Sequence, residues 1–89
     1  MNISIERLWT FACSGNIEAL KAHYNKYPDK TNIRYNRFNT EHSLIMGAFR
    51  NNQLETVEYL MSVGETVTEK EKEEILKELK RIDIISRLI

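Results

Sequence analysis

One segment of this chain interleaves aromatic and basic side chains, a combination suited to binding another molecule. Large contact area, fixed donors and a low entropy cost of ordering make tyrosine and arginine the dominant residues of protein-binding hot spots. The segment therefore predicts a binding surface for another protein. Between residues 24 and 42 the aromatic side chains are Tyr24, Tyr27, Tyr35 and Phe38, the basic ones are Lys26, Lys30, Arg34 and Arg37, and the predicted contact residues are Arg34, Tyr35, Arg37, Phe38, Tyr27 and Lys30.

Two other interpretations of residues 24–42 stay open. Aromatic rings can stack on bases while cations neutralise phosphates, so RNA or single-stranded DNA is the alternative partner. Asp29 and Glu41 dilute the positive charge, and the whole chain has a net charge of zero, which disfavours a polyanion. In the second interpretation Tyr24, Tyr27 and Ile33 simply close the core under a loop, and the cations are ordinary solvated side chains.

Residues that could support catalysis are few. Cys13 could pair with His23 or His42, but a thiol beside Ala12 on the inner face of a helix is typical of a small buried apolar side chain. No acidic residue stands at a spacing that would orient His23 as a base. The thiol and two imidazoles are one ligand short of a structural zinc site, and residues 69–78 lack the spacing of a calcium loop. We expect no enzyme activity, no cofactor and no metal.

The composition predicts one small domain. The chain has 89 residues, and its 13 basic and 13 acidic side chains cancel. Their distribution is uneven, because residues 1–54 carry seven Lys/Arg against four Asp/Glu and residues 55–89 carry six against nine. A single cysteine, the lack of a leading apolar run and the lack of a membrane-spanning stretch predict a cytoplasmic protein. Richness in Asn, Ile and Lys hints at an AT-rich bacterial, phage or viral genome.

Two stretches of the chain repeat one pattern of apolar residues. Leu8 to Tyr24 and Ile45 to Met61 are offset by 37 residues, and the apolar positions coincide at that offset. Phe11-Ala12 in the first copy corresponds to Ala48-Phe49 in the second, which lets a ring on one layer pack beside a methyl group on the next. A period of about 20 to 50 residues is typical of stacked helical repeats, which bind partners on an extended surface.

The repeated residues resemble divergent ankyrin repeats. Gly15-Asn16-Ile17-Glu18 matches the turn and helix start of that family, and Asn51-Asn52-Gln53-Leu54-Glu55 matches with Asn in place of Gly. The family's helix-opening T-P-L-H is missing, and the period exceeds the usual one of about 33 residues. The resemblance covers residues 4–67 and implies an all-α solenoid of stacked helix-turn-helix pairs, in which the loops between repeats contact another protein.

The spacing of apolar residues and the residues that typically begin or end helices predict where the helices lie. The first should run from about Ser4 to Ser14 and end at Gly15, and the second, capped by Asn16, should stop at Pro28. Residues 28–40 lack a helical period and predict either a long irregular loop or a finger resembling a β-hairpin. We expect a third helix over residues 41–51 and a fourth over residues 54–63, closed by Gly64.

The C-terminal part should cap the stack. Thr68 and Glu71 form a capping box at the start of a helix. Residues 69–89 make either one helix or a pair broken near residues 81–83, and we favour the pair. Three units follow: repeat one over residues 4–40, repeat two over residues 41–67 and a cap over residues 68–89. In the tail, Ile84, Ile85, Leu88 and Ile89 either seal the cap, which we favour, or mediate a homodimer.

These expectations give one functional hypothesis. The chain is a helical repeat module that binds another protein through the loop and the adjacent inner helices. It would work as a small adaptor or as a stoichiometric inhibitor.

Overall fold

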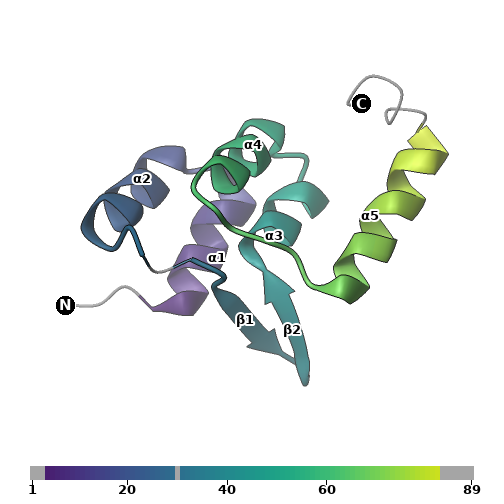
Figure 1. Ribbon diagram of the computed structural model, residues 1–89, viewed down its shortest axis with the longest axis horizontal. Coiled ribbons are helices and arrows are strands. Elements are labelled where there is room, and N and C mark those ends of the chain that lie inside the picture. Colours follow the sequence, from purple (N-terminus) through teal and green to yellow (C-terminus); the bar gives the residue numbers. More distant parts are fainter. Residues whose placement is uncertain (1–3, 30, 83–89) are drawn as a thin grey trace.

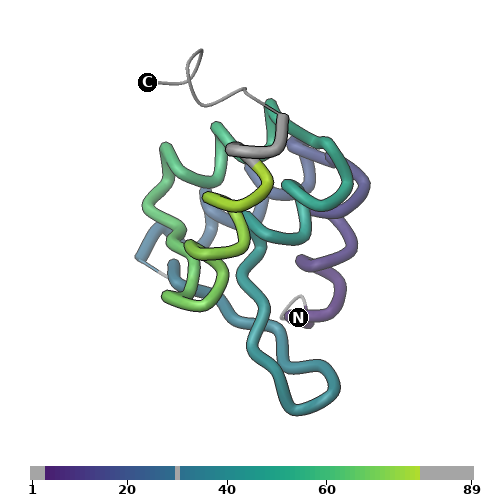
Figure 2. Tube along the Cα trace, turned by 90° about the vertical axis from the view of Figure 1, so that its right-hand side faces the viewer, coloured from purple at the N-terminus to yellow at the C-terminus, as the bar shows by residue number. Residues whose placement is uncertain are grey.

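The computed structural model describes residues 4–29 and 31–82 of the chain. The elements follow in the order α1 (Ile5–Ser14), α2 (Ile17–Lys26), β1 (Arg34–Arg37), β2 (Thr40–Ser43), α3 (Leu44–Arg50), α4 (Leu54–Ser62) and α5 (Glu69–Ile82). Figure 1 shows the helices in a row, with α2 at one end and α5 at the other. The strands project beyond the helices, as the perpendicular view in Figure 2 also shows.

The prediction of an all-α solenoid is wrong. Within the described residues, five helices accompany a two-stranded antiparallel sheet, so the fold is mixed. Arg34 pairs with Ser43 and Arg37 with Thr40, and the turn between the strands is Phe38-Asn39. Both turn residues have positive φ, 53° and 59°, as a two-residue turn that matches the twist of its strands requires. Of the two alternatives for residues 28–40, the structure forms the hairpin.

The helix ends are set by local capping, and the predicted caps at Gly15 and Asn16 are confirmed. The Ser4 hydroxyl accepts a hydrogen bond from the Arg7 amide, and the Asn16 side chain accepts one from the Ala19 amide. Gly15 ends α1 with a φ of 75°, and Asn52 holds a φ of 57° in the turn before α4. Asn therefore does replace Gly at positive φ in the second turn, as expected.

The later helices differ in part from the expectation. The third helix begins at Leu44 because residues 40–43 belong to β2, and the Ser43 hydroxyl caps it by accepting from the Met46 amide. The fourth helix lies where it was predicted. Helix α5 continues through Arg81 to Ile82 without a break. A second helix after that point, and the tail residues Ile84, Ile85, Leu88 and Ile89 with their sealing or dimerising roles, lie outside the described residues.

The hydrophobic core is built from α1 to α4. Its members are buried side chains of the two similar stretches and of the residue just before the second stretch: Leu8, Ala12, Leu20, Tyr24, Leu44, Ile45, Ala48 and Leu60. The two alanines are fully buried, which lets α1 and α3 approach closely. No helix among the described residues has both the length and the apolar character needed to span a bilayer.

Candidate functional site

The tip of the hairpin exposes a large aromatic side chain. Phe38 is 85% exposed, the highest value among the exposed large apolar side chains of the described residues. The Arg37 guanidinium lies 5.1 Å from the centre of the Phe38 ring, within cation–π range. A bulky residue at positive φ costs about 1 to 2 kcal/mol, and asparagine or glycine would avoid most of that cost. The tip therefore carries an exposed ring at a position that local backbone energetics disfavour.

An aromatic patch of Trp9, Tyr35 and His42 lies where the hairpin meets α1. The Tyr35 and His42 rings are cross-strand partners, and their centres lie 5.3 and 5.5 Å from the Trp9 ring. All three side chains are half-buried. Arg50 borders the patch, since its Nη1 lies 3.2 Å from His42 Nδ1. A guanidinium can only donate, so His42 Nδ1 is the acceptor in this contact.

Glu65 holds the start of the hairpin. Its carboxylate is 4% exposed and accepts hydrogen bonds from the Tyr24 hydroxyl at 2.6 Å and from the Ile33 amide at 3.1 Å. Burial raises the pKa of Glu65, although these two bonds, the Arg34 charge and the Asn32 amide all oppose the rise. Burial and the same carboxylate raise the pKa of Tyr24 far above its usual range, so Tyr24 stays the donor.

Glu71 holds the end of the hairpin. Its carboxylate is 5% exposed and accepts from two backbone amides, Ser43 at 3.0 Å and Thr68 at 2.9 Å. Burial alone would raise the pKa of Glu71, but the hydrogen bonds from Thr68 and Ser43 outweigh burial and lower it. The Thr68 hydroxyl in turn accepts from the Glu71 amide at 3.1 Å, which completes the predicted capping box. The same carboxylate thus caps α5 and anchors β2.

Arg34 ties the base of the hairpin to the connection between α4 and α5. Its Nη1 donates to the carbonyls of Ile33 and Thr66, and its Nη2 donates to the Thr66 hydroxyl, each at 3.1 Å. That hydroxyl donates to the Asn32 side chain at 2.6 Å. With Glu65 and Glu71, these bonds fix both strands of the hairpin to residues 65–71, so the tip is carried by a rigid base.

The structure divides the six predicted contact residues. Arg37 and Phe38 lie together at the tip, whereas Arg34 and Tyr35 make contacts within the fold. Tyr27 ends α2, half-buried, with Lys26 Nζ 5.6 Å from its ring centre. Lys30 lies outside the described residues. A binding role for any of them stays a prediction. Tyr24 belongs to the hydrophobic core and Ile33 packs against it, as the second interpretation of residues 24–42 predicts.

Sequence reasoning missed the residues that surround the hairpin. Trp9, Arg50 and Glu65 received no role, although each contacts a residue of the predicted segment or its flank. The local sequence pattern did not indicate a role for these residues, because their contacts join residues far apart in the sequence. The capping box did identify Glu71, but not its second bond to Ser43.

Two of the residues considered for catalysis, Cys13 and His23, are half-buried and buried. Burial raises the pKa of the Cys13 thiol, with the Arg50 charge partly opposing the rise, so the thiolate form is disfavoured. His23 is 7% exposed and packs edge-on against the Tyr24 ring. Over residues 4–29 and 31–82, no three His, Cys, Asp or Glu side chains are grouped to hold a metal ion.

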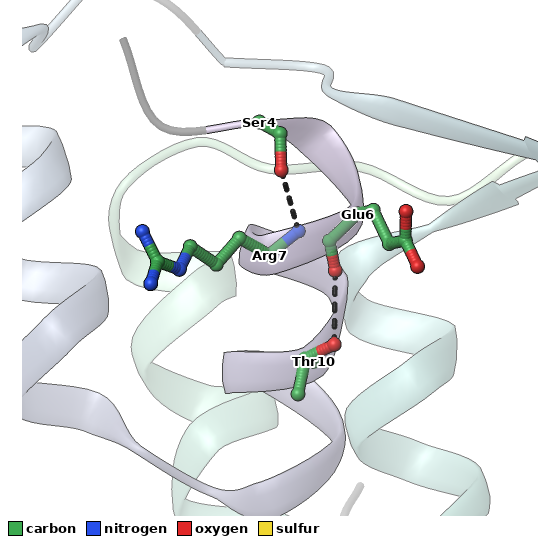
Figure 3. A pocket seen from close by; sticks show the side chains of 4 residues that line it. All are labelled: Ser4, Glu6, Arg7 and Thr10. Carbon is green, nitrogen blue, oxygen red and sulfur yellow. Dashed lines mark hydrogen bonds between the residues drawn. The ribbon is translucent and has the colours of Figure 1, made fainter. Parts of the chain in front are cut away.

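A shallow pocket lies on the first turns of α1. Its lining residues, Ser4, Glu6, Arg7 and Thr10, are shown in Figure 3. Ser4 accepts from the Arg7 amide, and the Thr10 hydroxyl donates to the Glu6 carbonyl at 3.0 Å. The carboxylate of Glu6 and the guanidinium of Arg7 point to different sides in this view. The pocket's polar groups serve the helix and do not converge on a ligand.

Comparison with protein-family models, curated proteins and solved structures finds no match to this chain. The resemblance to ankyrin repeats therefore stays a prediction from the quoted residues.

Proposed function

We propose that this protein is a non-enzymatic module that binds another protein through the tip of its hairpin, as a small adaptor or a stoichiometric inhibitor. The observation that carries the proposal is Phe38. An exposed aromatic ring at positive φ gives up backbone stability without a packing gain, and such departures from local preference mark functional positions. The cytoplasm is the compartment that we propose for this activity.

The base of the hairpin supports the same proposal. Ordering a loop on binding costs free energy, and a site that is already rigid avoids that cost. Glu65 and Thr66, in the connection before α5, hold Ile33 and Arg34 at the start of β1, and Glu71 of α5 holds Ser43 at the end of β2, so the tip is preorganised. The aromatic patch adds half-exposed area beside the tip, with Arg50 at its border. Aromatic and arginine side chains of this kind are enriched where binding energy concentrates.

The proposal is tested by affinity capture from the native host with the wild type, Phe38→Asn and Asn39→Gly. Both substitutions place a residue that tolerates positive φ in the turn, but only the first removes the ring. Wild type and Asn39→Gly should retain one protein partner that Phe38→Asn loses, with and without nuclease. Capture that depends on nucleic acid, or that survives the loss of Phe38, would overturn the proposal.

A further inference from the structure

Helix α5 is joined to the rest of the molecule differently from the other helices. No side chain from the described part of α5 belongs to the hydrophobic core or to the apolar residues packed against it. Leu76 is 54% exposed. In Figure 1, α5 stands at the end of the row of helices, connected by the extended segment that follows α4. Over residues 69–78, the part of α5 whose side chains the structure describes, polar contacts therefore provide the attachment to the other elements.

Two glutamates supply the attachment of α5 instead. Glu71 accepts from the Ser43 amide at the end of β2, and Glu74 binds Arg50 of α3 through two hydrogen bonds, at 3.0 and 3.2 Å. The Arg50–Glu74 pair is exposed, with side-chain values of 39% and 46%. An exposed ion pair of this kind contributes little to stability and is screened by salt. The Arg50–Glu74 contact can therefore be exchanged for a contact with a partner.

The Arg50 guanidinium contacts two acceptors at once. It donates to Glu74 on α5 and to His42 of the aromatic patch. Glu74 thus covers the cation that borders the patch, in the two-bond arrangement that a carboxylate from another molecule would adopt. When α5 leaves, the guanidinium becomes available beside Trp9, Tyr35 and His42.

We propose that α5 is a releasable arm, which undocks from an intact body of α1 to α4 and the hairpin when its carboxylate contacts are lost. In the docked state it shields Arg50, and in the released state Arg50 donates to an acidic group of a partner. The second statement rests on the proposed binding function, while the first is a property of the isolated protein. Helix α5 has 14 residues, and isolated helices of about 12 to 15 residues are marginal in water, so the released arm loses helical order.

Hydrogen exchange followed by mass spectrometry tests the arm without any partner. In Glu71→Ala/Glu74→Ala, amides of α5 should exchange about tenfold faster or more, because a released helix of this length is barely stable. Amides of α1 to α4 should keep their wild-type rates. Glu74→Gln alone should give a smaller change in the same direction, and so should about 1 M salt, which shortens the screening length to about 3 Å.

Two control variants separate undocking from general weakening of the helix. Glu73→Ala removes an exposed carboxylate that makes no hydrogen bond or ion pair with another described residue, and should leave exchange unchanged. Thr68→Ala removes the cap bond to the Glu71 amide but keeps the Glu71–Ser43 bond, so it should affect only the first turn of α5. Faster exchange throughout α1 to α4 in the double variant, or global unfolding, would show that α5 is an integral part of the fold and overturn the proposal. Unchanged exchange in α5 would overturn it equally. Neither result depends on whether Phe38 binds a partner.

Discussion

The Tyr24 hydroxyl donates a 2.6 Å hydrogen bond to the buried carboxylate of Glu65, which lies 41 residues further along the chain. This bond connects α2 to the segment that precedes α5, and the other oxygen of Glu65 accepts from the Ile33 amide just before β1. Glu71 holds the other end of the hairpin, and each of its two oxygens accepts from a backbone amide, Oε2 from Ser43 and Oε1 from Thr68. The Tyr24 hydroxyl that faces Glu65 can donate or accept a hydrogen bond, whereas the backbone amides that face Glu71 can only donate.

Because of this difference, position 65 should tolerate a glutamine and position 71 should not. In Glu65→Gln the new amide can donate to the Tyr24 oxygen while the carbonyl accepts from Ile33, and the cost of burying a charge disappears. We expect a change in unfolding free energy of about 1 kcal/mol or less. In Glu71→Gln an N–H group must face a backbone N–H, so the loss should be about 1 to 3 kcal/mol. Chemical denaturation measures both, and equal losses would contradict the described bonding.

The same two residues predict opposite dependences on pH. The pKa of Glu71 is lowered from its usual 4.5, so its contribution to stability is present above that value and is lost as pH falls below it. The pKa of Glu65 is raised, so the folded state takes up a proton more readily than the unfolded state. Stability should therefore decline as pH rises from 4.5 through the raised pKa.

Melting curves over about pH 3 to pH 8 separate these contributions. Glu71→Gln should flatten the acid limb of the wild-type stability profile, and Glu65→Gln should remove the decline on the side of higher pH. Profiles that keep the wild-type shape in both variants would show that neither carboxylate changes its proton affinity on folding.

Gly47 is required for the packing of α3 against α1. A methyl group at this position would meet the Trp9 ring at 2.9 Å and the Cys13 sulfur at 3.1 Å. Gly47→Ala gains about 1 kcal/mol of helix propensity but should lose about 1 to 3 kcal/mol from overpacking. Because Trp9 is the single tryptophan, its fluorescence reports the displaced ring. Trp9→Leu should relieve the clash in the double variant, and a double-mutant cycle without coupling would contradict this packing.

The turn at the tip predicts a gain of stability on mutation. Phe38→Asn should raise the unfolding free energy by about 0.5 kcal/mol, because relief of the positive φ outweighs the weak exposed contact with Arg37. Asn39→Gly should have a similar effect. Thermal denaturation measures both changes. A marked loss of stability in Phe38→Asn would assign the ring a structural role and remove the main support for a binding tip.

Features fixed by a few neighbouring residues were predictable from the sequence. Ser4, Asn16 and Asn52 end or begin helices through bonds and dihedrals that involve the adjacent turn alone. The extent of the hairpin was not, because Phe38-Asn39 lacks the glycine that usually marks a two-residue turn, and residues 41–43 were assigned to a helix. The anchoring of the hairpin could not be predicted either, because Glu65 and Glu71 contact its two ends from 28 to 32 residues away.

The candidate site was predictable only in part for the same reason. Composition identified the segment that contains Arg37 and Phe38, and the structure places both at the tip. The contacts of Arg34 with Thr66 and of Tyr35 with Trp9 were not predicted. Periodicity could identify Trp9 as a residue of α1, but no local rule indicates which strand crosses it.

Photo-crosslinking at the tip tests the central claim most directly. A photoreactive phenylalanine analogue in place of Phe38 is compared with the same analogue in place of Leu54, an apolar side chain on α4 that is 59% exposed. Irradiation in the native host, followed by mass spectrometry, identifies what each position touches. A tip that binds a protein should crosslink to one protein from position 38 and not from position 54, with the adduct resistant to nuclease. Equal adducts from both positions, or an adduct to nucleic acid at position 38, would contradict the account.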